Sequence, residues 1–163
     1  ALVAATGECA HLAVIAGDRA LYVAQEAPQS GMSVDAPVGT LAPLHCTALG
    51  KVLLAFQAEP AREALIGRLR LDSFTRRTIA EPARLREGLQ EVRRTGSAVD
   101  DEEFSVGVRC IAAPVRRHDG AVAGAIGISG PSPRVTNARL AEWDAVLREQ
   151  ADALSVRLGW HNG

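Results

Sequence analysis

The apolar positions of this chain follow two kinds of spacing, and each kind predicts a different element. Residues 9–26 contain two runs of aliphatic and β-branched residues around Gly17–Asp18, a pattern that predicts a β-hairpin turning at this pair. Residues 27–45 are rich in Pro, Gly and Ser, which predicts a long ordered loop. Loops of this length within a compact domain are usually functional.

Four segments carry apolar residues at the three- and four-residue spacing of a helix. Thr47 is a suitable cap for the first, Pro82 occupies the first position of the third, and Thr136 caps the last. We predict helices at 47–56, 60–69, 82–95 and 136–158, and short strands at 74–78 and 97–101.

A second hairpin is predicted where apolar runs flank Asp119–Gly120. With a two-residue loop at this pair, Cys110 lies opposite Ser129. Because strand side chains alternate, the face that holds these two residues is lined by small residues, while the other face presents Ile and Val to covering helices. Asp100, on the preceding strand, can reach the same end of the sheet. The register therefore predicts that Asp100, Cys110 and Ser129 converge on one cavity.

The same three residues have a plainer interpretation. A free cysteine such as Cys110 often behaves as a small buried apolar residue. Ser129 can bond to backbone at the end of a strand, and Asp100 can shape a turn. The residues alone leave both interpretations open.

The order of the predicted elements, ββααβαβββα, indicates an α+β domain with a central, mainly antiparallel sheet flanked by helices. The 163 residues suit one domain, and 47% hydrophobic with 23% charged residues is typical of a globular protein. No apolar stretch reaches the roughly 18 residues that a membrane helix needs, so no membrane partner is predicted. The first residues also lack the basic and apolar regions of a signal peptide.

The formal net charge is −1, and no cluster of Lys and Arg is dense enough to predict a nucleic-acid surface within these residues. The chain has an odd number of cysteines, Cys9, Cys46 and Cys110, and no two of them form a CxxC pair. This pattern argues against a disulfide framework and a zinc ribbon, and it favours a reducing cytosol.

The segment "PLHCTALGKVLLAF", residues 43–56, offers three kinds of chemistry. As a phosphate-binding loop it fails, because the pattern GxxxxGK[ST] is not met. As a nucleophile with its base, the neighbouring His45 and Cys46 are a weak candidate, since adjacent side chains usually point apart. The third possibility is a helix start whose free N–H groups, at Ala48 and Leu49, hold a small anion. A simply capped helix that packs its apolar face explains most of the segment and does not exclude the ligand.

Three stretches together resemble a known family. They are "APVGTLAPLHCTALGKVLLAF", "RTIAEPARLREGLQEVRRTGSAVDDEEFSVGVRCIAAPV" and "AVAGAIGISGPSPRVT". In order and spacing they are similar to the effector-binding domain of IclR-type transcriptional regulators, and the similarity runs from about Gly7 to Leu158. The resemblance implies a GAF-like fold and a non-enzymatic, ligand-sensing role without cofactor or metal.

The resemblance also implies partners that are not visible in these residues. A winged helix-turn-helix domain is expected to precede this segment, so residues 1–8 are predicted to be the end of a linker and residues 9–163 the effector-binding domain. DNA would be contacted only through that preceding domain. A homodimer or homotetramer in the cytoplasm is the expected assembly.

In the family, small organic or aromatic acids bind a pocket on one face of the sheet. The residues of this chain that match the pocket positions are Gly31, Val34, Ala48, Leu49, Asp100, Val108, Cys110, Gly127 and Ser129. Gly127 stands where members that bind small keto acids have a second hydroxyl, and Gly31 replaces a bulkier apolar residue. Both departures imply a larger pocket or a lost polar contact, and they favour a ligand larger than glyoxylate or pyruvate.

The sequence therefore predicts a sensor domain that binds a small organic acid, with its carboxylate on the Ala48 and Leu49 amides and with Ser129 and Cys110 as further partners. Asp100 would bond a hydroxyl or a protonated group, because an ionised carboxylate beside an anion is repulsive. The alternatives are a GAF-like enzyme or cofactor sensor that uses a Cys/Asp pocket, and a purely oligomerising module.

Overall fold

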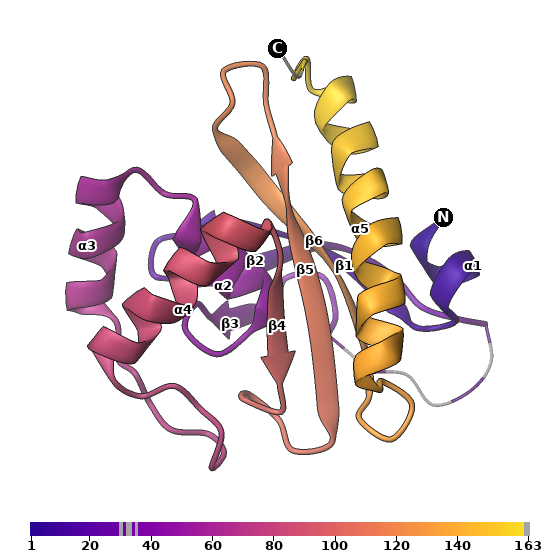
Figure 1. The fold of residues 1–163 in the computed structure, drawn as a ribbon, viewed down its shortest axis with the longest axis horizontal. Helices are drawn as coiled ribbons and strands as arrows, with labels where there is room; N and C mark the ends of the chain where they lie inside the picture. Colours follow the sequence, from indigo (N-terminus) through magenta and orange to yellow (C-terminus); the bar gives the residue numbers. More distant parts are fainter. Residues whose placement is uncertain (30, 32–33, 35, 162–163) are drawn as a thin grey trace.

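A six-stranded antiparallel sheet forms the centre of the molecule (Figure 1). The computed structural model describes residues 1–29, 31, 34 and 36–161. In spatial order the strands are β3 (Leu41–Pro43), β2 (Arg19–Glu26), β1 (Cys9–Ala16), β6 (Val122–Pro131), β5 (Val108–Arg116) and β4 (Ala98–Asp101). Every neighbouring pair is antiparallel, which confirms the α+β class predicted from the order of elements.

Helices cover both faces of this sheet (Figure 1). One face packs against α2 (Ala48–Ala55), which α3 (Glu59–Arg68) and α4 (Pro82–Thr95) cover from outside. The other face packs against the long α5 (Asn137–Arg157), beside which lies the short α1 (Leu2–Thr6). The four longer helices lie where the spacing of apolar residues predicts them.

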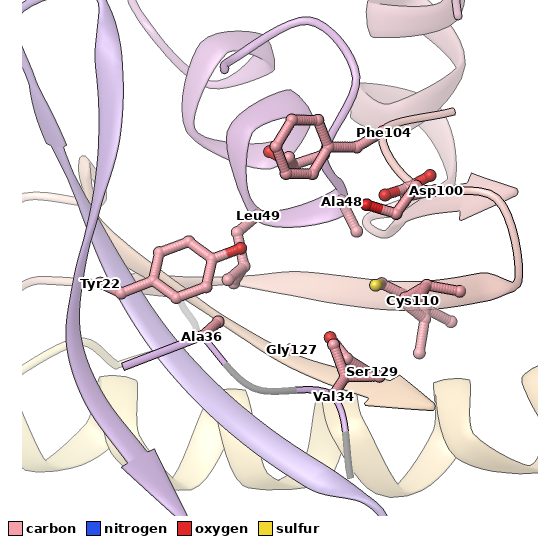
Figure 2. A pocket seen from close by; sticks show the side chains of 14 residues that line it. Tyr22, Val34, Ala36, Ala48, Leu49, Asp100, Phe104, Cys110, Gly127 and Ser129 are labelled. Atoms are coloured by element: carbon pink, nitrogen blue, oxygen red, sulfur yellow. The ribbon is translucent and has the colours of Figure 1, made fainter. Parts of the chain in front are cut away.

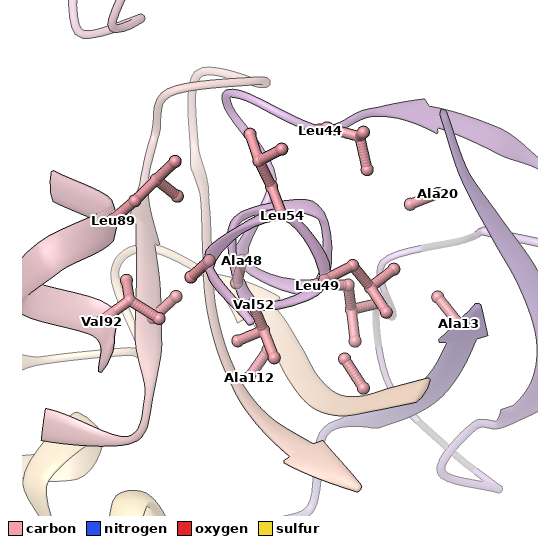
Figure 3. Packing of buried hydrophobic residues seen from close by; sticks show 14 of the residues in the cluster. Ala13, Ala20, Leu44, Ala48, Leu49, Val52, Leu54, Leu89, Val92 and Ala112 are labelled. Carbon is pink, nitrogen blue, oxygen red and sulfur yellow. The ribbon is translucent and has the colours of Figure 1, made fainter. Parts of the chain in front are cut away.

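The two faces differ in the size of the side chains that they present. On the α5 side, Ile111 and Ile128 pack against Trp143 and Leu147, and all four are buried. On the α2 side the sheet offers small residues such as Ala112, and bulky helix residues fill the space above them (Figure 3). This division follows from the alternation of side chains along β5 and β6.

Helix α2 lies unusually close to the chain that leads into it. Its cap is Thr47, whose hydroxyl accepts a hydrogen bond from the Gly50 amide at 3.1 Å and donates one to the Pro43 carbonyl at 2.7 Å. A Cβ at Gly50 would lie 2.6 Å from the Leu44 Cα and 2.6 Å from the Pro43 oxygen. Glycine at position 50 therefore lets the first turn of α2 sit against β3, which fixes the place of the helix start.

Two local predictions need correction, and one short helix was not predicted. Helix α1 lies within residues 1–8, and its Leu2 and Thr6 are buried, so this part of the expected linker packs on the domain. Strand β3 lies within the predicted loop 27–45 and pairs with β2. The predicted strand 74–78 is wrong, because this segment contains a bend at Thr75 and a turn at residues 76–77 and no strand.

Side-chain hydrogen bonds take the place of a strand ladder at residues 74–78. The Thr78 hydroxyl accepts from the backbone amides of Phe74 and Thr75 at 3.0 and 2.9 Å. The same hydroxyl donates to the Glu103 carbonyl at 2.6 Å, and the Thr75 hydroxyl donates to the Glu102 carbonyl at 2.7 Å. Threonine thus satisfies the local backbone groups and ties this segment to the loop after β4.

The register of the second hairpin agrees with the prediction, although its turn does not. Cys110 pairs with Ser129 as expected. The loop, however, holds three residues, because Arg117 and Ala121 are hydrogen-bonded across it at 3.0 Å. A bulge at Ala123 adds one residue to β6 and restores the predicted pairing beyond it.

Among the described residues, no helix has both the length and the apolar character needed to span a membrane.

Candidate functional site

A cavity of about 110 Å³ lies between the start of α2 and the small-residue face of the sheet (Figure 2). The loop after β4, together with Val34 and Ala36, completes its walls. Its described lining consists of Tyr22, Val34, Ala36, Thr47, Ala48, Leu49, Asp100, Phe104, Ser105, Val108, Cys110, Ile111, Gly127 and Ser129. A cavity of ~150 Å³ in another protein holds benzene, so this one suits a molecule of similar or smaller size.

The structure brings together all but one of the residues predicted for the site. Val34, Ala48, Leu49, Asp100, Val108, Cys110, Gly127 and Ser129 line the cavity. Gly31 is exposed and is not among the lining residues. The convergence of Asp100, Cys110 and Ser129, which was inferred from strand register, is therefore seen directly (Figure 2).

The start of α2 supplies free donors to this cavity. The Gly50 amide donates to the Thr47 hydroxyl, and the Lys51 amide donates to the Thr47 carbonyl at 2.9 Å. Within the described part of the chain, the amides of Ala48 and Leu49 have no such acceptor. Because free N–H groups at a helix start carry partial positive charge, this wall of the cavity attracts an anion.

Asp100 is the buried carboxyl group of the site, with only 3% of its surface exposed. One of its oxygens accepts a hydrogen bond from the Glu103 amide at 2.7 Å. Burial raises the pKa of Asp100 to about 7, while the hydrogen bond from Glu103 and the nearby Lys51 oppose that rise. Near neutral pH this carboxyl is therefore present both as an acid that can donate and as an anion that accepts.

Cys110 lines the cavity and Cys46 does not, and both thiols are held in their protonated form. Burial raises the pKa of Cys110 to about 12, against a lowering effect of the hydrogen bond to Ser129. Burial also raises the pKa of Cys46 to about 12, and the neighbouring His45 donates from Nε2 to the carbonyl of Asp72 instead. Since the thiolate is the nucleophile, neither cysteine is prepared for covalent chemistry.

The loop after β4 is held in place by a buried ion pair. Lys51, on α2, donates from Nζ to the Glu103 carboxylate and to the Val99 carbonyl, both at 2.6 Å. Glu102, in the same loop, has the left-handed φ of 58°, and its carboxylate accepts from the Gly107 amide at 2.7 Å. These contacts fix the segment that carries Asp100 and Phe104 into the cavity.

The effect expected of Gly127 is not observed in full. A Cβ at this position would lie 2.9 Å from the Ile111 carbonyl and 3.2 Å from the Leu49 Cδ2. The space above the glycine is thus already filled by the Leu49 side chain. The glycine therefore adds no space to the cavity, and the lost polar contact stays a prediction.

Sequence reasoning missed several lining residues, of which Tyr22 is the largest. Tyr22 comes from β2 in the first hairpin, and that hairpin reaches the site only because β1 pairs with β6. This pairing joins residues more than a hundred positions apart, for which no local signal exists. The remaining missed residues are Ala36, Thr47, Phe104, Ser105 and Ile111.

A metal centre finds no support in the part of the chain that the structure describes, where no group of three or more His, Cys, Asp or Glu side chains could hold an ion. The three cysteines are free thiols.

Comparison with known proteins connects this geometry to one family. The family model for the C-terminal part of the bacterial transcriptional regulator IclR matches residues 1–156. The HTH-type transcriptional regulator BhcR of Paracoccus denitrificans is 37% identical over 154 residues, which cover 94% of this chain and 55% of that protein. The chain thus spans about half the length of this relative.

Solved structures agree with the family match. The crystal structure of the Thermotoga maritima IclR has a TM-score of 0.93 at 30% identity, over 98% of this chain and 64% of that one. The inducer-binding domain of the Acinetobacter transcription factor PobR, solved as a double mutant with 3-hydroxybenzoic acid, has a TM-score of 0.87 at 28% identity. That alignment covers 94% of this chain and 91% of the PobR domain. These relatives are named as regulators and not as enzymes, and they share the GAF-like arrangement predicted from the sequence.

Proposed function

Because this chain belongs to the IclR family of bacterial transcriptional regulators and forms their C-terminal effector-binding domain, we propose that its cavity binds a small organic acid. The observation that carries this proposal is the meeting of two free helix-start amides with Ser129 in one cavity of about 110 Å³. An anionic carboxylate fits donors of this kind, since each such hydrogen bond is stronger than one between neutral groups.

The carboxylate would lie on the amides of Ala48 and Leu49, and the Ser129 hydroxyl would donate to the same group. Cys110, which stays protonated, would be a weak further donor. Asp100 would face a hydroxyl or another neutral polar group of the ligand. An ionised Asp100 beside the carboxylate is disfavoured, and its raised pKa lets it be protonated at little cost.

Binding would act on transcription through a DNA-binding domain outside this chain. A ligand shifts the population of two arrangements only by its difference in affinity for them. The loop after β4 is a suitable reporter of occupancy, because it lines the cavity and is tied to residues 75 and 78 by hydrogen bonds. We propose a homo-oligomer as the form in which paired DNA-binding domains respond.

Calorimetric titration of a panel of monocarboxylic acids tests this proposal. Ser129→Ala should weaken the best-binding acid by ten- to a hundredfold, since a hydrogen bond to a charged group is worth about 1.5–3 kcal/mol. Asp100→Ala should also weaken any acid that carries a hydroxyl. Ser73→Ala, at an exposed serine that is not among the lining residues, is the matched control and should leave the affinity unchanged.

Unchanged affinity in both Ser129→Ala and Asp100→Ala would contradict the proposed site. The absence of saturable binding by any acid would contradict the proposed ligand class itself.

A further inference from the structure

Tyr22 brings a free hydroxyl group to the cavity. Its side chain is partly buried, and its ring packs against His11 with 5.4 Å between the ring centroids. Its backbone is anchored on both sides, because its amide donates to the Thr40 carbonyl at 2.9 Å and its carbonyl accepts from the Gly39 amide at 2.8 Å. No hydrogen bond of the hydroxyl is seen to any residue that the structure describes, and the hydroxyl points into the cavity (Figure 2).

Tyr22 and Asp100 approach the cavity from opposite sides. In the sheet order, β2 and β4 are separated by β1, β6 and β5. Four strand spacings of about 4.8 Å would place the two backbones roughly 19 Å apart in a flat sheet, and only a long side chain on β2 can reach the middle of the site. Figure 2 shows the Tyr22 ring on the far side of the cavity from Asp100 and Cys110.

These two groups differ in what they can offer a ligand. Burial raises the pKa of Tyr22 above its usual range, so its hydroxyl remains a donor. Asp100 is the acidic residue of the described lining, and none of the described lining residues is Lys, Arg or His. The cavity therefore has a neutral donor at Tyr22 on one side and the carboxyl group of Asp100 on the other, with the start of α2 along the wall between them (Figure 2).

This polarity limits the charge of the occupant. One carboxylate can be satisfied by the neutral donors of Tyr22, Ser129 and the two amides. A second carboxylate would lie toward Asp100, where it could bind only the protonated form of this group and would meet no cation in the described lining to offset its buried charge. A hydroxyl in that place can instead donate to Asp100 or accept from it.

Building on the function proposed above, we propose that Tyr22 is a specificity-determining residue that donates a hydrogen bond to the ligand's carboxylate. The ligand is a small monocarboxylate that also bears a hydroxyl group. It lies with its carboxylate toward Tyr22 and the start of α2, and with its hydroxyl toward Asp100.

Lactate and propionate, which differ only by one hydroxyl, are the matched probes for this orientation. Calorimetry should show that the unaltered chain binds lactate more tightly than propionate. Malate, which adds a second carboxylate to lactate, and lactamide, which lacks the charge, should each bind at least tenfold more weakly than lactate.

Two variants separate the two sides of the cavity. Tyr22→Phe keeps the ring and its packing, and it should weaken lactate and propionate by the same factor of about ten, because both share the carboxylate. Asp100→Ala should weaken lactate alone and bring the two affinities close together. Melting temperatures of both variants establish that each is folded during the titrations.

The possible failures can be told apart. If Ser129→Ala weakens lactate but Tyr22→Phe does not, the inference about Tyr22 is wrong and the proposed site stands. If Tyr22→Phe weakens lactate and leaves propionate unchanged, the orientation is reversed and the inference is overturned. Malate binding as tightly as lactate would refute the limit on charge. If none of these acids nor any other in the panel binds saturably, the proposed function fails together with this inference.

Discussion

Asp100, on β4, combines three properties. It is buried, it accepts a backbone hydrogen bond from Glu103, and it faces a cavity that is suited to an anion. The hydrogen bond alone would lower the pKa of Asp100, yet burial outweighs it and the pKa rises to about 7. A buried carboxyl group that ionises near neutral pH is typical of a functional position. A carboxyl group with a purely structural role does not stabilise the fold by being hard to ionise.

This shift predicts how stability depends on pH. Well below pH ~4, Asp100 is protonated in the folded and unfolded chains alike, and its ionisation costs no stability. As the pH rises toward 7, the unfolded chain loses this proton first, so the contribution of Asp100 to the free energy of unfolding is lost, by at most about 4 kcal/mol. Asp100→Asn keeps the acceptor for Glu103 and removes the ionisation.

Urea denaturation of both proteins at several values between pH 5 and 8 measures this effect. As the pH rises to about 7, the free energy of unfolding of the unaltered chain should fall relative to that of Asp100→Asn. Above about pH 7 the difference between the two should stay constant. A difference that does not change with pH would show that Asp100 ionises as it does in an unfolded chain.

The ion pair of Lys51 and Glu103 joins α2 to the loop after β4. Only 7% and 10% of the two side chains are exposed. Removing one partner from a buried pair leaves the other charged and unsolvated, at a cost of about 3–5 kcal/mol, whereas replacing both can be nearly neutral. The pair therefore makes the position of the loop depend on α2.

A double-mutant cycle tests this dependence. Lys51→Met alone should lower the free energy of unfolding by about 3–5 kcal/mol, and adding Glu103→Leu should recover a large part of the loss. Arg86→Met is the matched control, because the side chains of the Arg86–Glu63 pair are 45% and 42% exposed and losing this pair should cost no more than about 1 kcal/mol. Losses that simply add in the double variant would show that the two side chains do not act as a pair.

Elements with local signals could be predicted from the sequence, and those that depend on distant pairing could not. Thr47 and Thr136 each accept a hydrogen bond at the start of a helix, as their positions indicated. Strand β3, in contrast, has three residues and is defined by its pairing with β2, not by its own composition. Threonines at 75 and 78 looked like strand residues, but their hydroxyl groups satisfy the backbone of a turn.

The site shows the same division between local and distant information. Asp100, Cys110 and Ser129 were predicted together because β4, β5 and β6 follow one another along the chain, so their register can be counted. The count from Asp119–Gly120 was correct only because a bulge in β6 offsets the extra turn residue. Tyr22 could not be placed, since the pairing of β1 with β6 has no counterpart in the local pattern.

The sheet separates two apolar clusters, one on each of its faces, and only one of them borders the ligand cavity closely. The cluster on the α2 side includes Leu49, which forms a wall of the cavity. The cluster on the α5 side contains none of the residues assigned to binding. Its Ile111 borders the cavity only because it lies on β5 beside Cys110. Interiors are tightly packed, so each cluster supports the sheet, but only the first shapes the ligand's surroundings. Stability and ligand affinity should therefore respond differently to substitutions on the two faces.

Leucine truncations on the two faces test this separation. Leu147→Ala, at a fully buried position of α5, should lower the free energy of unfolding by about 2–5 kcal/mol and leave the affinity for the best-binding carboxylic acid within about twofold. Leu49→Ala opens the cavity above Gly127, so it should destabilise the fold and also change the affinity and the ranking of acids of different size. Denaturation and calorimetry, both well below the melting temperature of each variant, measure the two quantities. A large loss of affinity in a folded Leu147→Ala variant would mean that the α5 face takes part in binding, because the sheet would then transmit a change in packing from one side to the other.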